Sequence, residues 1–154
     1  MRYLMIDRIE ELKRHSYAVG TKCITLSDDC FEHHFPGQPI YPGALLIETM
    51  AQLGGALLEI SLRDDMGYCP RCVLSTVKAK FREFAHPGDL LSIRAEVVSI
   101  HDDSAMVRGS VMRADETISE AEMIFVFLRV EDLRLESSRR ELIELLTRKT
   151  KFVE

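Results

Sequence analysis

The segment from Pro42 to Met66 predicts one long helix that is apolar on almost every side. Proline is well tolerated at the first position of a helix, so Pro42 marks its start. A helix without a polar face is expected to be buried in a core and not to lie on a surface. Its apolar residues are Ala44, Leu45, Leu46, Ile47, Met50, Ala51, Leu53, Ala56, Leu57, Leu58 and Ile60.

The rest of the chain predicts mainly strands, joined by short connections. In Leu91 to Val97 apolar and polar residues alternate, which indicates a strand with one buried face. One buried helix followed by strands with short antiparallel connections predicts an α+β fold, in which a curved sheet wraps around a central helix. The other expected strands are Tyr3 to Leu12, Ser16 to Thr25, Val73 to Phe84, Met106 to Arg113 and Ser119 to Arg129.

The length and composition predict a single domain over residues 1–154. With 46% hydrophobic residues the chain can bury a core of its own. The tail, residues 136–154, predicts a short amphipathic helix with Arg148 and Lys149 at its C-terminal end, where the helix dipole favours cations. This tail is a helical extension of the domain.

The net charge of −5 gives no electrostatic support for a nucleic-acid partner. No apolar run approaches the length of a membrane span, and Asp7 stands where a secretory signal would stay apolar. We therefore expect a cytoplasmic protein that does not cross a membrane.

The four cysteines are expected to be free thiols, since a chain of this size is stable without disulfides. Cys69 and Cys72 have the spacing of a zinc or redox pair, but Cys23 and Cys30 do not form a second such pair. A loop with incidental cysteines, and no bound metal, is the favoured interpretation.

The run from His34 to Gly43 contains three prolines and two glycines, which fix the path of a rigid loop. This loop is expected to hold His34 in place, where a neutral imidazole can accept a proton. Glu48 follows on the apolar helix, and burial disfavours the charged form of a carboxyl group. We therefore interpret His34 as a candidate base and Glu48 as a candidate acid, the pair that loss of water from a 3-hydroxyacyl compound requires. The alternatives are a hydrogen-bonded surface histidine and a glutamate at the helix edge.

Two further residues complete this candidate site. The amide of Gly43, at the start of the helix, is expected to polarise a thioester carbonyl as negative charge develops. Gln52 lies one turn beyond Glu48 on the same face and is expected to orient its carboxyl group.

Lys78, Lys80 and Arg82 alternate along one expected strand and should share a face. Such a face suits an acidic partner, although it also suits simple solvation.

The motif His34-Phe35-Pro36-Gly37-x-Pro39-Ile40-x-Pro42-Gly43, followed by Glu48-x-Met50-Ala51-Gln52, resembles the signature of the 3-hydroxyacyl-acyl-carrier-protein dehydratases of fatty-acid synthesis. Segments Tyr3 to Arg8, Lys80 to Arg82 and Pro87 to Asp89 are also similar to that family, so the resemblance extends from Tyr3 to about Arg129.

This resemblance implies the hot-dog fold, with His34 and Glu48 as the catalytic pair contributed by different subunits of a homodimer. It also implies that Gly43, Phe35 and Gln52 contact or position the substrate, and that no cofactor or metal is used. The partner would be an acyl carrier protein, and the dimers of this family commonly assemble into trimers of dimers. Glutamate at position 48 resembles the plain dehydratase branch more than the branch that also isomerises its product.

Among the departures from the family, His33 stands where glycine is common, and the C-terminal tail is additional. Acyl chain length and pathway, whether fatty-acid, specialised lipid or polyketide, therefore stay open. Two other functions also stay open: a non-catalytic subunit that binds an acyl carrier, and a hot-dog acyl thioesterase.

Overall fold

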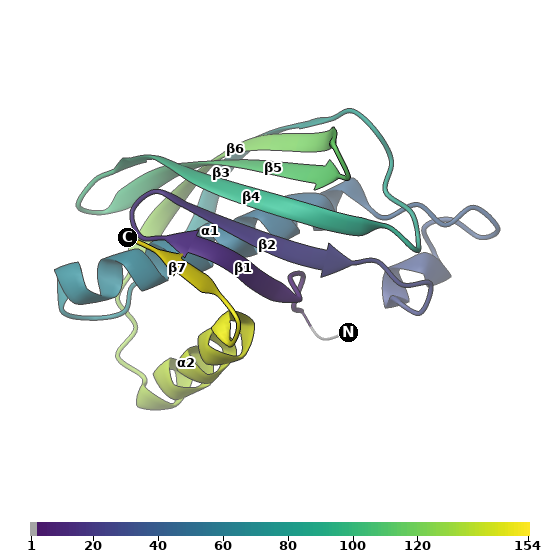
Figure 1. The fold of residues 1–154 in the computed structure, drawn as a ribbon. Coiled ribbons are helices and arrows are strands. Elements are labelled where there is room, and N and C mark those ends of the chain that lie inside the picture. Colours follow the sequence, from purple (N-terminus) through teal and green to yellow (C-terminus); the bar gives the residue numbers. More distant parts are fainter. Residues whose placement is uncertain (1–2) are drawn as a thin grey trace.

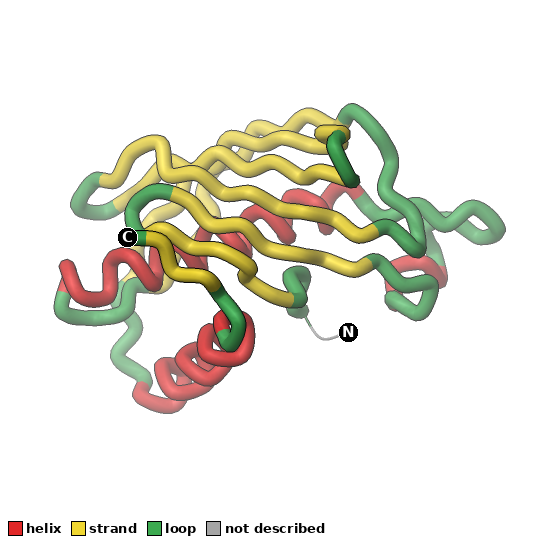
Figure 2. The backbone as a smooth tube through the Cα atoms, viewed as in Figure 1, coloured by secondary structure: helices red, strands yellow, loops and turns green. Residues whose placement is uncertain are grey.

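The computed structural model describes residues 3–154, which form a curved seven-stranded sheet around a long helix (Figure 1). The order in the sheet is β3-β6-β5-β4-β2-β1-β7, and all neighbours are antiparallel except β1 and β7. The predicted α+β hot-dog fold is confirmed, with helices on one side of the sheet (Figure 2). The elements are β1 (Arg8–Lys13), β2 (Tyr17–Cys23), η1 (Asp29–Glu32), α1 (Gly43–Met66), β3 (Arg71–Phe81), β4 (Leu90–Ile100), β5 (Ser104–Arg113), β6 (Glu116–Leu128), α2 (Leu133–Thr147) and β7 (Lys151–Val153).

Helix α1 is the core helix that its sequence predicts. It contacts β2, β3, β4, β5 and β6, and it ends at Gly67, whose φ of 68° is a left-handed conformation that glycine adopts without strain. By length and hydropathy alone, α1 is the one helix within residues 3–154 that could cross a membrane, so the expectation that no apolar run approaches that length is wrong. However, 78% of its apolar window is buried inside the fold, as in a core helix.

Helix α1 approaches the sheet closely where β5 has a glycine. A Cβ atom built on Gly109 would lie 2.9 Å from both Cβ and Sδ of Met50, closer than two such atoms can pack. Met50 is fully buried, so it has no free space to move into. Glycine at position 109 therefore sets the distance between α1 and the centre of the sheet.

The first strand is shorter than its sequence predicts. It begins at Arg8, whereas the expected strand began at Tyr3. Met5 and Ile6 are adjacent in sequence and both buried, a pattern that a strand with one buried face does not give. The segment before β1 instead lies beside α1, where the Met5 amide donates to Oε1 of Gln52 at 2.8 Å.

The C-terminal tail also differs from its prediction. Helix α2 begins at Leu133, because the Asp132 side chain accepts hydrogen bonds from the amides of Arg134 and Leu135. The helix ends at Thr147, so the cations expected in its last turn lie beyond it. The short parallel strand β7 was not predicted, because three residues are too few to produce a periodic signal.

Two glycine-to-alanine substitutions test the packing of α1. Gly109→Ala should lower the free energy of unfolding by about 1–3 kcal/mol, because the new methyl group overlaps Met50. Gly55→Ala on α1 is the matched control, since its Cβ would have no neighbour closer than 3.8 Å. Alanine is favoured over glycine inside a helix by about 1 kcal/mol, so this variant should be stabilised. Urea unfolding followed by circular dichroism measures both, and equal effects of the two substitutions would contradict the account.

Candidate functional site

The loop before α1 holds the imidazole of His34 in one orientation. His34 is partly buried, and its Nδ1 lies 2.7 Å from the carbonyl oxygen of Ile40. A carbonyl oxygen only accepts hydrogen bonds, so Nδ1 carries the proton in this contact. In the neutral ring Nε2 then holds the free lone pair, and His34 can accept a proton there.

Backbone hydrogen bonds fix the loop around this histidine. The amide of His34 donates to the carbonyl of Cys30, and Ile40 donates back to the carbonyl of His34. Phe35 and Gln38 exchange a pair of backbone hydrogen bonds across the turn. The ring of Phe35 stacks on the imidazole at a centroid distance of 4.1 Å and is 51% exposed, so an apolar surface adjoins the candidate base.

Glu48 lies on α1, where Gln52 holds one of its two carboxyl oxygens. The Gln52 Oε1 accepts from the Met5 amide, which can only donate, so the Nε2 group of Gln52 faces Glu48. This Nε2 donates to Oε1 of Glu48 at 2.9 Å. Gln52 therefore holds Oε1 of Glu48, and Oε2 is free of this contact. The contact between Glu48 and Gln52 is the one expected from their spacing on the helix.

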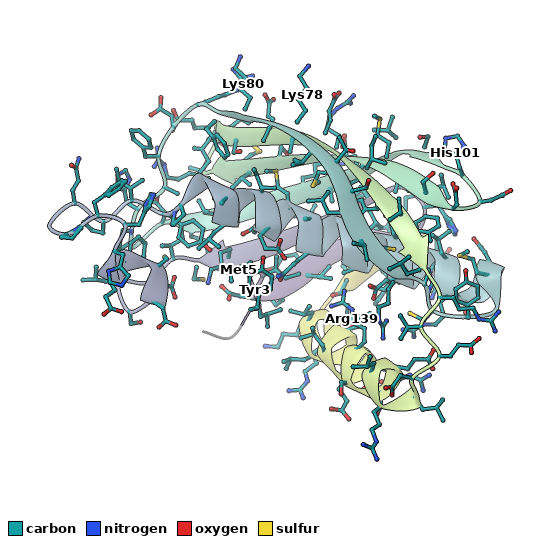
Figure 3. The ribbon with its side chains drawn as sticks, turned by 180° about the vertical axis from the view of Figure 1, so that it is seen from behind. Tyr3, Met5, Lys78, Lys80, His101 and Arg139 are labelled. Atoms are coloured by element: carbon teal, nitrogen blue, oxygen red, sulfur yellow. The ribbon has the colours of Figure 1, made fainter. Side chains whose placement is uncertain are left out.

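Two features around Glu48 were not expected from the sequence. Glu48 is only partly buried in the single chain, although the helix that carries it is a buried one. The Tyr3 hydroxyl also lies close to it, and burial together with the Glu48 carboxylate raises the pKa of Tyr3. Figure 3 shows Tyr3 and Met5 beside α1. The adjacent apolar residues Met5 and Ile6 were the available signal that this segment packs on the helix instead of forming a strand.

Gly43 is the first residue of α1, and it lies against the end of β3. A Cβ atom at this position would be 3.0 Å from the ring of Phe81, so a larger residue would displace either the ring or the helix start. The residue before it, Pro42, offers no side-chain hydrogen bond to the first turn of the helix. The amides of Leu45 and Leu46 already donate to the Pro42 carbonyl, so those of Gly43 and Ala44 are the ones available to an acceptor brought by a ligand.

A cavity of about 400 Å³ lies beside Glu48. Residues from α1, β3, β6, α2 and the N-terminal segment line it, whereas His34 is not among these lining residues of the described chain. The structure thus brings Glu48 and Gln52 together at one cavity, and it places His34 and Phe35 in the loop before α1. Within a single chain the two candidate catalytic groups do not face the same cavity.

A second acidic residue of α1, Glu59, is more deeply buried than Glu48. It is only 2% exposed, and its Oε2 accepts a hydrogen bond of 2.7 Å from Nε of Arg139 on α2. Arg71 on β3 lies 3.9 Å from the same oxygen. Sequence reasoning missed Glu59 because its partner is 80 residues away in the chain, and no local pattern reports such a contact.

The cysteines and histidines within residues 3–154 form no group of three or more metal-ligating side chains. All four cysteines are free thiols. Cys72 is partly buried, and burial raises the pKa of its thiol.

His33, beside the candidate base, is exposed and ends η1.

The basic residues expected on one strand lie at the edge of the sheet. Lys78 and Lys80 point outward, away from α1 (Figure 3), and line a hollow on the outer face of the sheet. Arg82 follows the end of β3 and forms an ion pair with Glu120 at 2.6 Å. Lys80 and Arg82 flank Phe81, so they lie close to the start of α1 at Gly43.

Comparisons with known structures agree with the fold. A thioesterase-like protein with coenzyme A from Streptococcus pneumoniae matches 81% of this chain with a TM-score of 0.62 and 16% identity. The PaaI protein of E. coli matches 77% with a TM-score of 0.57 and 15% identity. At such low identity these likenesses establish the architecture alone.

Comparisons of sequence identify the family. The FabA-like domain family matches residues 1–122. The 3-hydroxyacyl-[acyl-carrier-protein] dehydratase FabZ of Clostridium acetobutylicum is 39% identical over 126 residues, which cover 81% of this chain and 87% of that protein. The FabZ of Syntrophotalea carbinolica is 38% identical over 125 residues, with 81% and 84% covered. By its match over most of its length and by these identities, this chain belongs to the FabA-like dehydratase family.

Proposed function

We propose that this protein is a hydro-lyase that dehydrates 3-hydroxyacyl thioesters carried by an acyl carrier protein, giving trans-2-enoyl thioesters in fatty-acid or related lipid synthesis. The observation that carries the proposal is the pair of fixed orientations at His34 and Glu48 in a chain of this family. The contact with Ile40 leaves Nε2 of His34 to accept a proton. The contact with Gln52 occupies Oε1 of Glu48, so Oε2 is the oxygen that we assign to proton donation, in a carboxyl group that also interacts with the Tyr3 hydroxyl.

The reaction follows from these two atoms. Nε2 of His34 removes a proton from C2 of the substrate, and the electrons of that C–H bond form the C2–C3 double bond. The C3–O bond breaks as Oε2 of Glu48 gives its proton to the departing hydroxyl group, which leaves as water. Charge that develops on the thioester oxygen is stabilised by the Gly43 amide and the positive end of the α1 dipole. Exchange of a proton with solvent then returns both groups to their starting states.

We propose further that the site is shared between two copies of the chain. β3 is one of the two edge strands of the sheet, and it pairs on one side only, with β6. Its Val77 and Phe81 lie opposite the buried residues Met123 and Ser119, yet they are 39% and 48% exposed. Exposed apolar side chains on an unpaired edge suit a second copy of the chain, which would cover them and bring its His34 to the cavity of Glu48.

The alternatives have less support. The structural neighbours named as thioesterases share only the fold, at low identity. A non-catalytic subunit that binds an acyl carrier would not need the two fixed proton positions.

Free cysteines suit a reducing compartment, so we place the enzyme in the cytoplasm.

The catalytic pair is tested first by single substitutions. Glu48→Gln keeps the shape of the side chain and removes its transferable proton, and His34→Ala removes the base. Each should lower kcat by at least about 100-fold, the lower end of the usual range for acid-base groups. The measurement is the loss of ultraviolet absorbance as a crotonyl thioester is hydrated, the reverse reaction.

The matched control is His33→Ala, which removes the neighbouring exposed histidine. This variant should keep most of the activity. If His34→Ala or Glu48→Gln kept more than about a tenth of the wild-type kcat while folded, the assigned role would be wrong.

A mixed dimer tests the shared site. If His34 of one subunit acts with Glu48 of the other, a dimer of His34→Ala and Glu48→Gln chains has one site with both changes and one with neither. Random pairing of the two inactive proteins gives about half mixed dimers, so refolding them together should restore roughly a quarter of wild-type activity. Mass spectrometry of intact dimers confirms the mixing, and mixed dimers without activity would place both residues in one subunit's site.

The partner is tested by charge reversal near the start of α1. Lys80→Glu should raise KM for a substrate on the acidic acyl carrier protein by several-fold at low salt, with little change for a small thioester mimic. Lys149→Glu makes the same change at an exposed lysine beyond α2. Equal losses on both substrates, or an equal effect at Lys149, would contradict docking beside Lys80.

A further inference from the structure

The cavity beside Glu48 extends along one face of α1. Glu48, Gln52, Gly55 and Glu59 all line it, and their spacing of four, three and four residues places them on one side of the helix. Glu59 is eleven positions after Glu48, which corresponds to a rise of about 16 Å along the helix. The cavity therefore leads away from the proposed acid toward a second, buried carboxylate.

One wall of this cavity comes from the C-terminal tail. Leu142 and Arg139 of α2 line it together with residues of β3 and with Phe125 of β6. The family match ends at residue 122, and α2 begins at Leu133. This part of the cavity is therefore built by a segment that lies outside the FabA-like match.

Helix α2 is held firmly in this position. Its Ile143 and Leu146 are 7% and 2% exposed, and the Leu135 carbonyl accepts a hydrogen bond of 3.0 Å from Arg71. Beyond the helix, the Thr150 hydroxyl donates to the Ile9 carbonyl at 2.6 Å, and β7 pairs with β1. These contacts make α2 a fixed wall and not a mobile lid.

The far end of the cavity is charged. Glu59 accepts from Arg139 at 2.7 Å, with Arg71 at 3.9 Å, and Arg139 extends from α2 toward the body of the domain (Figure 3). An apolar chain pressed against this cluster would remove water from charged groups without replacing its hydrogen bonds, which is unfavourable. Methylene groups are therefore opposed at the Glu59 end of the cavity.

We propose that α2 closes the acyl pocket of this enzyme, and that Leu142 with the Glu59–Arg139 ion pair restricts the site to short acyl chains. This inference rests on the proposed dehydratase function. It assigns a role in chain-length selection to the tail, which supplies two of the lining side chains and half of the ion pair.

The test compares kcat/KM for hydration of crotonyl and trans-2-dodecenoyl thioesters of coenzyme A. Wild type should favour crotonyl. Leu142→Ala opens the wall, and the double variant Glu59→Leu/Arg139→Leu removes both partners of the 2.7 Å ion pair together, while Arg71 keeps its hydrogen bond to the Leu135 carbonyl. Both should raise the dodecenoyl-to-crotonyl ratio about tenfold or more, since each methylene accommodated in an apolar pocket is worth roughly that factor.

Matched controls in the C-terminal tail make the same chemical changes away from the cavity. These are Leu145→Ala and the double variant Glu144→Leu/Arg148→Leu, whose residues are all exposed and do not line the cavity beside Glu48. They should leave the ratio at its wild-type value. A wild type that hydrates both substrates equally, or a ratio unchanged in both pocket variants while circular dichroism shows them folded, overturns the proposal.

A binding measurement separates this proposal from the proposed reaction. Calorimetric titration with butyryl- and dodecanoyl-coenzyme A, which cannot be dehydrated, should show that only the pocket variants gain affinity for the longer chain. That result without any turnover would reject the dehydratase and keep the pocket's selectivity. Turnover without discrimination by chain length would reject the role of α2 alone.

Discussion

The contact between Gly109 on β5 and Met50 on α1 fixes the distance from the central helix to the sheet, and the proposed active site depends on it. A methyl group at position 109 would meet Met50 at 2.9 Å, so the helix is held as close to the sheet as its backbone and Met50 allow. Glu48, Gln52 and Glu59 are on this same rigid helix. Their spacing is therefore set by helix geometry, and their depth is set by the packing of α1.

Polar contacts extend this rigidity from the core to the chemistry. Gln52 accepts from the Met5 amide and donates to Glu48, so the N-terminal segment and the proposed acid are oriented by one side chain. On the other side, the loop before α1 orients His34 through the carbonyl of Ile40. The Met5 amide can only donate, so it decides which end of the Gln52 side chain faces Glu48. The Ile40 carbonyl can only accept, so it decides which ring nitrogen of His34 carries the proton. Backbone geometry thus orients both side chains that we propose for the reaction.

The sequence predicted those parts of the structure that depend on a pattern among residues close together in the chain. The burial of α1 and the alternation in β4 are periodic, and the contact between Gln52 and Glu48 follows from a spacing of four residues. The parts that it did not predict depend on distant segments. The Glu59–Arg139 pair joins α1 to α2, the segment before β1 packs on α1, and β7 pairs with β1 across most of the chain. Within one chain His34 does not line the cavity beside Glu48. This too is a property of the fold, so residue types and spacing alone could not give it.

The Glu59–Arg139 pair is difficult to explain by stability alone. Removing two charges from water is unfavourable, and an apolar pair of similar volume is often as stable as a buried ion pair. The position is otherwise suited to apolar residues, since its neighbours on α1, Leu58 and Ile60, are buried in the core. What the ion pair adds is polarity at the end of a cavity that begins at Glu48. Methylene groups of a substrate gain nothing from such a surface, so the ion pair is better explained by selection of the substrate than by stability of the fold. The tail, which supplies Arg139, then contributes to the substrate specificity that we propose.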